Sequence, residues 1–370
     1  MKTKNKLNIT ILDFDDIKNP LLGAGQARAT VEVGKRLAKK GHKVFVVSSR
    51  FPKSQDRFEN GMKYIHIGLG SNNIKLNNIL YILSLPLYLK KIKSNLVIEC
   101  FTSPISTLFS PVLTNTPVVA IPTSFEADRF TKLYHLPFGV IEKFGCRFYK
   151  YFLPYTEFLD VKMRKYNPNI ISKIVPEGVG EEFFKIKLKT PKHILFLGRF
   201  DIDQKGIDLL LKAYSKVSKN IKYPLLIAGN GADKEKIEQL IKKYKIDKQV
   251  RLIGPQYGEG KEKILSESLF VAFPSRNEGF SLFSLEALAS GLPLVSFDIP
   301  ALKWADKNVA LKAKPFDVNE YSKLLKKATE KRIINKMRKN TRELAKQYTW
   351  NKVVNKYEAF FNAILNKYEN

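Results

Sequence analysis

Short apolar runs alternate with amphipathic stretches along the 370-residue chain. The first run, at 7–14, leads into a loop that contains Gly23-Ala24-Gly25. Residues 26–40 then place apolar side chains near helical spacing, Gly41 supplies a stop, and a second apolar run follows at 43–48. Strand, glycine loop, helix and strand in this order predict a βαβ unit, which implies a parallel sheet.

The same pattern starts again in the second half of the chain, after a polar segment at 181–192. We therefore predict an α/β fold with two Rossmann-like domains, residues 1–180 and 181–345, and a final amphipathic helix within 346–370. The further strands are expected at 64–67, 96–99, 118–121, 193–198, 225–228, 250–253, 269–273 and 294–297, and the further helices at 207–217, 234–244 and 350–368.

Charge and cysteine content limit the possible binding partners and the cellular compartment. The 64 Lys and Arg exceed the 35 Asp and Glu and give a net charge of +29. This charge favours phosphates, nucleic acid or an anionic membrane face as partners, although a Lys-rich surface that only keeps the protein soluble fits equally well. Cys100 and Cys146 lack metal-ligand spacing, so we predict a reducing, cytoplasmic setting and no metal. No apolar run approaches the ~20 residues of a membrane span, and the N-terminal run is too short for a signal peptide.

The segment from Pro274 to Pro293 carries the most informative chemistry. A strand is expected to end before it, and a helix is expected to begin near Ser281, whose hydroxyl can cap it. Backbone N–H groups at such a helix start attract anions, and Gly279 lets a ligand approach the main chain. Glu278 and Glu286 bracket this candidate site.

Two cations occur at the start of the second βα series. Arg199 follows the first strand of that series, and Lys205 precedes its first helix. A planar guanidinium and a compact ammonium can both neutralise a diphosphate. Taken alone, however, each is better read as an ordinary surface cation among 64.

Together these segments resemble the retaining glycosyltransferases of the large family 4. The resemblance rests on Glu278, seven residues, Glu286 and the following Ala287-Leu288-Ala289-Ser290-Gly291-Leu292-Pro293, and it extends to further short motifs. These are Gly198-Arg199-Phe200, Lys205-Gly206, Pro176-Glu177-Gly178-Val179, and Gly23-Ala24-Gly25 with Arg28.

The resemblance implies a GT-B fold, in which two Rossmann-like domains face each other across a cleft and the last helix crosses back to the first domain. It also implies transfer of a sugar, with retention, from a UDP- or GDP-sugar to a glycan or lipid-linked acceptor, without a cofactor or metal. The catalytic set it implies is Glu278, Glu286, Arg199 and Lys205. The donor-binding set is Gly198, Gly279, Phe280, Ser281, Leu282 and Glu286, and the acceptor or phosphate loop comprises Gly23, Ala24, Gly25, Arg28, Thr123 and Ser124.

The sequence departs from the family pattern at two places. Many relatives carry a histidine just after the strand that corresponds to 118–121, whereas this chain reads Pro122-Thr123-Ser124-Phe125-Glu126. The loop after Phe297 lacks the family's common glycine pair and glutamate. The sugar-contacting part of the site is therefore the part that the resemblance assigns least well.

Other functions fit parts of the sequence. A nucleotide-sugar epimerase or a sugar-phosphate synthase would share the architecture, and a non-catalytic nucleic-acid binder would share the charge but would need an aromatic and basic motif that is not evident. Residues 79–93 and 144–152 mix apolar with basic side chains. Such helices can lie on the inner face of an anionic membrane, but apolarity on nearly every face of 80–89 favours a core helix with a solvated lysine tip.

Overall fold

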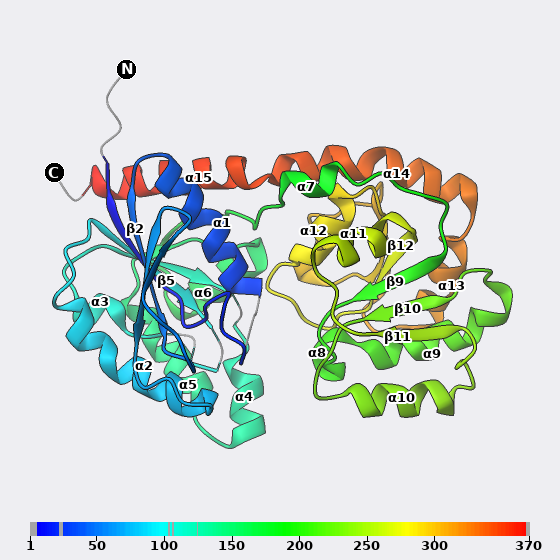
Figure 1. The fold of residues 1–370 in the computed structure, drawn as a ribbon, viewed down its shortest axis with the longest axis horizontal. Helices are drawn as coiled ribbons and strands as arrows, with labels where there is room; N and C mark the ends of the chain where they lie inside the picture. Colours follow the sequence, from blue (N-terminus) through cyan, green and yellow to red (C-terminus); the bar gives the residue numbers. More distant parts are fainter. Residues whose placement is uncertain (1–5, 22–24, 103, 106, 124, 368–370) are drawn as a thin grey trace. The chain divides into compact units, whose positions relative to one another are not determined.

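The computed structural model describes residues 6–21, 25–102, 104–105, 107–123 and 125–367. Two compact units make up the chain (Figure 1). The first unit contains residues 1–177 together with 350–370, and the second contains 178–349. The sequence pattern predicts boundaries at 180/181 and 345/346, within five residues of those found.

The first unit is built on an eight-stranded sheet in the order β3-β4-β2-β1-β5-β6-β7-β8. All neighbouring pairs are parallel except β3 with β4. The elements are β1 (Asn8–Leu12), α1 (Gly25–Lys39), β2 (Lys43–Ser49), β3 (Arg57–Glu59), β4 (Met62–Ile67), α2 (Ile74–Leu89), β5 (Leu96–Phe101), α3 (Ser110–Leu113), β6 (Val118–Pro122), α4 (Ala127–Tyr134), α5 (Phe138–Gly145), η1 (Cys146–Phe148), β7 (Tyr151–Phe152), α6 (Glu157–Tyr166), β8 (Ile171–Ser172) and α15 (Trp350–Leu365).

The second unit has a six-stranded, wholly parallel sheet in the order β11-β10-β9-β12-β13-β14. Its elements are α7 (Glu181–Phe184), β9 (His193–Leu197), α8 (Ile202–Lys205), α9 (Ile207–Val217), η2 (Ser218–Asn220), β10 (Leu225–Ala228), α10 (Lys234–Lys243), β11 (Val250–Ile253), α11 (Gly258–Ser266), β12 (Ser268–Phe273), α12 (Leu282–Ala289), β13 (Leu294–Phe297), η3 (Pro300–Leu302), β14 (Ala310–Ala313), α13 (Val318–Lys327), α14 (Lys331–Ala345) and η4 (Lys346–Tyr348).

The central strands are buried along their whole length in both units, as β5 and β12 show. Continuous burial is typical of parallel strands with helices on both faces of the sheet. The predicted α/β class with two Rossmann-like parallel sheets is therefore confirmed. The sequence pattern does not predict the short strands β3, β7, β8 and β14.

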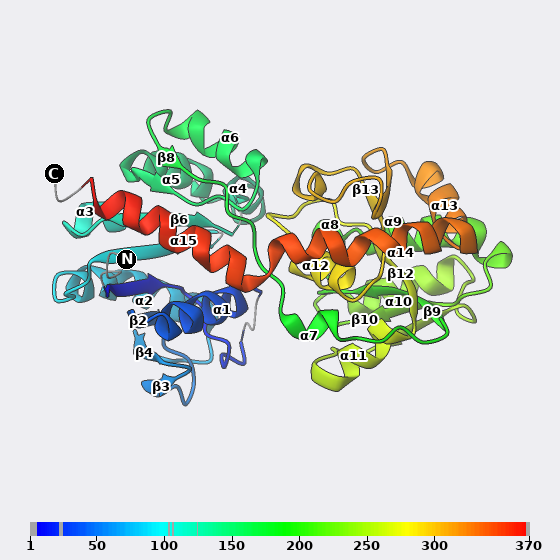
Figure 2. The same cartoon turned by 90° about the horizontal axis from the view of Figure 1, so that it is seen from above.

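The C-terminal helix α15 belongs to the first unit, where it runs beside α1 (Figures 1 and 2). Its buried Glu358 accepts a hydrogen bond from Lys40 at 2.9 Å and lies 3.4 Å from the ring nitrogen of His42. Arg36 of α1 also donates to Asn351 at 2.9 Å. These contacts attach α15 to α1 and to the residues that join α1 to β2.

Helix α2 differs from the prediction of a core helix. Tyr81 and Leu85 are buried, but Leu83 and Leu87 are 66% and 67% exposed. Both faces of α2 are apolar, so the sequence does not show which of them is exposed. The prediction of a core helix is therefore wrong for one of its faces.

Candidate active site

Two neighbouring strand ends form the candidate donor site in the second unit. Strands β9 and β12 are parallel neighbours, so the loops that follow them meet at the same edge of the sheet. The two loops are in close contact at Gly206, which has φ +64°. A Cβ there would lie 2.2 Å from the carbonyl oxygen of Pro274, so only glycine fits.

Lys205 and Glu278 form an ion pair between these loops. The Lys205 Nζ lies 2.6 Å from a Glu278 carboxylate oxygen, which also accepts a hydrogen bond from the Ser275 hydroxyl at 2.8 Å. The two charged side chains are only 19% and 9% exposed. The fold thus brings together two of the four predicted catalytic residues, which are 73 positions apart.

Arg199 lies in the same loop as Lys205, after β9. Its guanidinium is 60% exposed, donates to the side chain of Gln204 and lies 3.6 Å from Asp201. The structure therefore places Arg199 at the predicted edge of the sheet but pairs it with its own loop. Gly198, just before it, packs tightly as well, because a Cβ on Gly229 would lie 1.9 Å from the Gly198 carbonyl oxygen.

Helix α12 begins as predicted, with Ser281 as its N-cap. The Ser281 hydroxyl accepts a hydrogen bond from the Ser284 N–H at 3.2 Å. The Phe280 ring is buried and stacks on Trp304 with centroids 5.1 Å apart. Phe280 can therefore offer a ligand its main chain but not its ring. Gly279 and Leu282 flank these positions and are partly exposed.

Glu286 is buried in α12 and pairs with a residue that the sequence does not reveal. Lys261 of α11 places its Nζ 2.5 Å from a Glu286 carboxylate oxygen. The same ammonium lies 5.0 Å from the ring centroid of Phe183 and 5.8 Å from that of Phe283. Lys261 precedes the buried Ile264 and Leu265 by three and four positions, and this helical spacing is the signal that could have indicated its burial.

Arg276 is a second residue that the sequence does not reveal. It donates two hydrogen bonds to the Asp208 carboxylate, at 2.8 and 2.7 Å, and the Asp208 pair raises the Arg276 pKa. It also donates to the carbonyl of Ile202, and its own N–H donates to the carbonyl of Gln204. Arg276 therefore ties the loop after β12 to the loop after β9.

The predicted acceptor loop is described only in part. Gly25 is the first residue of α1 and is exposed, as is Arg28 one turn later. Gly23, Ala24 and Ser124 lie outside the described residues. Thr123 follows β6, and both its N–H and its hydroxyl donate to the carbonyl of Phe101 at the end of β5.

Two buried carboxyl groups lie on neighbouring strands of the first unit. Asp13, directly after β1, accepts hydrogen bonds from the Thr30 hydroxyl and from the Asp15 N–H. Burial raises the pKa of Asp13 to about 7, although the Thr30 hydrogen bond lowers it. Burial also raises the pKa of Glu99, on β5, to about 6. The apolar pattern gives no partner for an acidic residue at the end of a strand, such as Asp13, or within one, such as Glu99, so the sequence does not reveal that either carboxyl group is buried.

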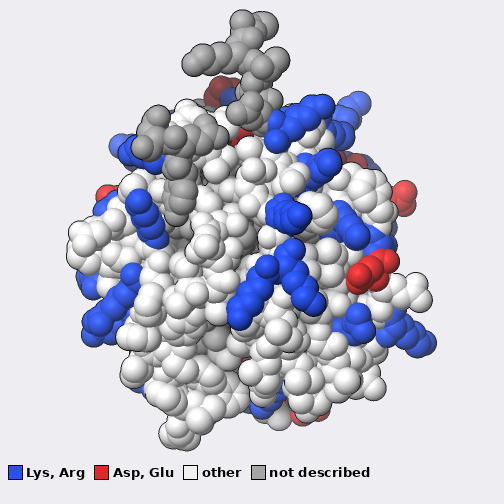
Figure 3. Space-filling view, turned by 90° about the vertical axis from the view of Figure 1, so that its left-hand side faces the viewer, with Lys and Arg blue, Asp and Glu red and all other residues white. Residues whose placement is uncertain are grey.

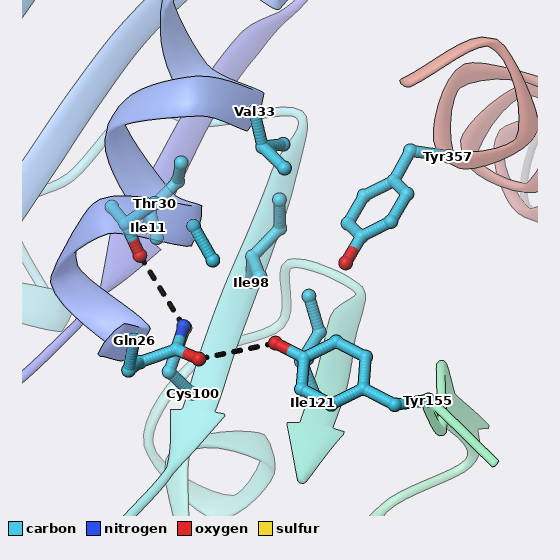
Figure 4. A pocket seen from close by; sticks show the side chains of 10 residues that line it. Ile11, Gln26, Thr30, Val33, Ile98, Cys100, Ile121, Tyr155 and Tyr357 are labelled. Atoms are coloured by element: carbon cyan, nitrogen blue, oxygen red, sulfur yellow. Dashed lines mark hydrogen bonds between the residues drawn. The ribbon is translucent and has the colours of Figure 1, made fainter. Parts of the chain in front are cut away.

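A small cavity lies between α1, the sheet and α15 of the first unit (Figure 4). Gln26 accepts a hydrogen bond from the Tyr155 hydroxyl at 3.0 Å, and its amide N–H lies 3.4 Å from Thr30 and 3.0 Å from the Cys100 sulfur. Gln26 thus links the polar groups of Tyr155, Thr30 and Cys100 at this cavity. We interpret it as a packing feature that fixes the first turn of α1.

Three of the four histidines make contacts away from the loop after β6, where many family members carry a histidine. His42 accepts from the Leu7 N–H, and His66 lies 3.0 Å from the buried Asp16 carboxylate. His193 lies 3.0 Å from the Ser268 hydroxyl. These contacts give each of them a structural role.

Comparison with known proteins agrees with this geometry. Residues 179–348 match the family model described as "Glycosyl transferases group 1". The second unit belongs to the group 1 glycosyltransferase family. An O-antigen biosynthesis glycosyltransferase, WclY, of Escherichia coli is 29% identical over 167 residues, which cover 43% of each chain. An uncharacterized glycosyltransferase of Methanocaldococcus jannaschii is 27% identical over 165 residues, 43% of this chain and 45% of its own.

Solved structures of the same fold match the chain over nearly its whole length. Sucrose-phosphate synthase from Thermosynechococcus elongatus has a TM-score of 0.83 at 16% identity and covers 98% of this chain and 100% of its own. WaaG, a glycosyltransferase involved in lipopolysaccharide biosynthesis, has a TM-score of 0.74 at 16% identity, with 95% and 99% covered. These likenesses show the GT-B fold, whereas the matched segments span less than half the length of the curated relatives named above.

Proposed function

We propose that the chain is a retaining glycosyltransferase that transfers a sugar from a nucleoside-diphosphate sugar, a UDP- or GDP-sugar, to a glycan or lipid-linked acceptor. The observation that carries the proposal is the convergence of Lys205, Glu278 and the capped start of α12 at the adjoining ends of β9 and β12. At this edge of the sheet, a cation and the N–H groups of a helix start can bind a diphosphate, and a carboxylate can contact a sugar.

Each part of this edge has a role in the proposed transfer. Departure of the diphosphate adds negative charge, which Arg199, Lys205 and the backbone N–H groups at Phe280 and Ser281 can stabilise. Glu286 would contact the nucleotide ribose, and Glu278 the sugar hydroxyls or the positive charge that develops on the ring. The loop after β1 and the first turn of α1, with Gly25 and Arg28, would hold the acceptor.

The names of related proteins support both the donor class and the acceptor class. A relative from Campylobacter jejuni, 32% identical over 122 residues that cover 33% of this chain and 32% of its own, is named as a diphospho-undecaprenol N-acetylgalactosaminyltransferase. A structure titled Anabaena HepE in complex with UDP and glucose has a TM-score of 0.72 at 12% identity, with 96% and 99% covered. A lipid-linked acceptor would lie at a membrane, so contact with an anionic membrane face belongs to the same proposal.

A donor screen tests the proposal. UDP-, GDP-, ADP- and TDP-sugars are compared by thermal shift and by release of nucleotide, because a ligand that binds only the folded state raises the melting temperature. Lys205→Met is expected to lower turnover by about 10²–10³-fold, as loss of one charge-stabilising group does elsewhere. Lys212→Met, which removes an exposed cation from α9, is the matched control and should leave turnover unchanged.

Other outcomes would contradict parts of the proposal. Failure of every nucleotide sugar to bind would refute it. Conversion of the sugar without an acceptor would indicate an epimerase instead. An inverted anomeric configuration of the product, read from proton coupling constants, would refute retention.

A further inference from the structure

The first unit carries nearly all of the exposed apolar side chains in the described part of the chain. Of 20 large hydrophobic residues that are exposed there, 18 belong to the first unit and two, Tyr257 and Phe316, to the second. Two units with the same architecture would bury their apolar faces equally well. The excess therefore marks the surface of the first unit for contact with something apolar.

Many of these side chains fall on one helix face. On α2, Leu76, Ile79, Leu83 and Leu87 are 38%, 52%, 66% and 67% exposed. Their spacing of three or four residues places them in a single stripe along the helix. Tyr81 and Leu85, on the other face, are buried, so the stripe is a second apolar face.

The stripe has neighbours on other helices. Lys75, at the start of α2, lies 5.0 Å from the ring centroid of Tyr134, at the end of α4, so these two helix ends adjoin. Residues exposed by 40% or more continue through α4, the following loop, α5 and η1. They are Leu133, Tyr134, Leu136, Val140, Phe144 and Phe148. We call these six residues and the four of the α2 stripe the apolar patch.

The charge around the patch is almost entirely positive. Residues 74–93 and 127–150 contain nine Lys and Arg but only two acidic residues, one of which, Glu142, is buried. Lys90, Lys91 and Lys93 directly follow α2 and are all exposed. Figure 3 shows the left-hand side of the view in Figure 1, where Lys and Arg lie at many points with uncharged surface between them and few acidic groups.

We propose that the apolar patch and its lysines dock on an anionic lipid bilayer. Acyl chains match exposed Leu, Ile and Phe, and anionic headgroups match Lys and Arg, so a bilayer satisfies both halves of the surface. A second copy of the chain would bring like charges together, and a nucleic acid would leave the aliphatic stripe uncovered. Among the described residues, none of the helices combines the length and the apolar character of a membrane span.

This inference rests on the proposed function, which supplies a reason for the enzyme to reach a lipid-linked acceptor. It adds the surface that makes the contact. Because the patch lies in the first unit, donor binding at the second unit does not depend on it. Vesicle binding can therefore be measured without any donor, and donor turnover without any vesicle.

The test is sedimentation of the full chain with vesicles of phosphatidylcholine and phosphatidylglycerol. Leu83→Glu/Leu87→Glu places two carboxylates on the α2 stripe, where both side chains are exposed and folding is spared. We expect vesicle affinity to fall by at least about tenfold, because each change removes apolar contact and adds repulsion. The charge-matched control, Asn340→Glu/Gln347→Glu on exposed sites of the second unit, should lose much less.

Three further arms complete the design. Lys90→Gln/Lys91→Gln/Lys93→Gln should weaken binding and flatten its dependence on salt, and vesicles of phosphatidylcholine alone should bind poorly. The proposal is wrong if the wild type does not bind anionic vesicles, or if both acidic double variants lose affinity equally. It is also wrong if the wild type self-associates through the patch, which light scattering would show as a dimer that Leu83→Glu/Leu87→Glu abolishes. If the wild type binds anionic vesicles but turns over no nucleotide sugar, the proposed function is refuted and the docking surface is not.

Discussion

Replacement of Asp13 by asparagine should make the first unit more stable at alkaline pH and alter it little in acid. The Asp13 carboxyl is buried, with a pKa of about 7 against an ordinary value of 3.8. Because the folded-state pKa is raised, the unfolded chain ionises first, and the stability that is present below pH 4 is lost as the pH rises to 7. The shift in the Asp13 pKa thus lowers the free energy of unfolding by about 4 kcal/mol above pH 7 and by about 1.5 kcal/mol at pH 5, relative to its value in acid.

An asparagine side chain at this position would avoid the penalty and keep one oxygen for the Asp15 N–H, which donates to Asp13 at 3.1 Å. We therefore expect Asp13→Asn to gain stability over the wild type, by about 1 kcal/mol at pH 5 and about 3 kcal/mol at pH 8. Urea denaturation followed by circular dichroism measures the change, and Asp128→Asn, on an exposed site of α4, is the control. Glu99 titrates in both proteins, so its contribution cancels. An equal difference between variant and wild type at pH 5 and at pH 8 would refute the reasoning.

Three further predictions concern the second unit. Lys261→Met should lower the free energy of unfolding by about 3–5 kcal/mol, because Glu286 then stays buried without this cation. Adding Glu286→Gln should recover part of that loss, and urea denaturation of the single and double variants measures both effects. Gly206→Ala should lower the free energy of unfolding by about 1–3 kcal/mol and weaken nucleotide binding, because the alanine Cβ would overlap the Pro274 carbonyl. Thermal shift with and without donor measures both effects. Arg199→Ala should weaken binding of the nucleoside diphosphate by about tenfold with little change in melting temperature, because the side chain is exposed; calorimetric titration would detect the loss.

The pattern of apolar runs predicts most of the strands because parallel strands buried on both faces are continuous apolar segments. The N-cap at Ser281 is likewise local, since one hydroxyl and the next turn decide it. The short strands β7 and β8 have two residues each, and such strands leave no periodic signal.

Contacts across the fold are less visible in the sequence. The predicted site places Lys205 and Glu278 at strand ends, but their 2.6 Å contact also needs β9 beside β12, which chain order does not give. Lys261 and Asp13 are charged residues that the fold buries, and a charged residue reads as solvated until its partner is known.

The charges of the second unit indicate two separate tasks at the proposed donor site. Lys205 and Lys261 are each held within 2.6 Å of a carboxylate, Glu278 and Glu286 respectively, and all four side chains are less than 20% exposed. A diphosphate that approached either pair would meet a cation whose charge is already balanced, at a cost in attraction of several kcal/mol at short range. Arg199, at 60% exposure, has only to leave its own loop to reach an incoming phosphate. We therefore propose that Arg199 captures the incoming donor. Lys205 would hold Glu278 in place until the donor is bound and then stabilise the departing diphosphate, and Lys261 would hold Glu286 in a fixed position.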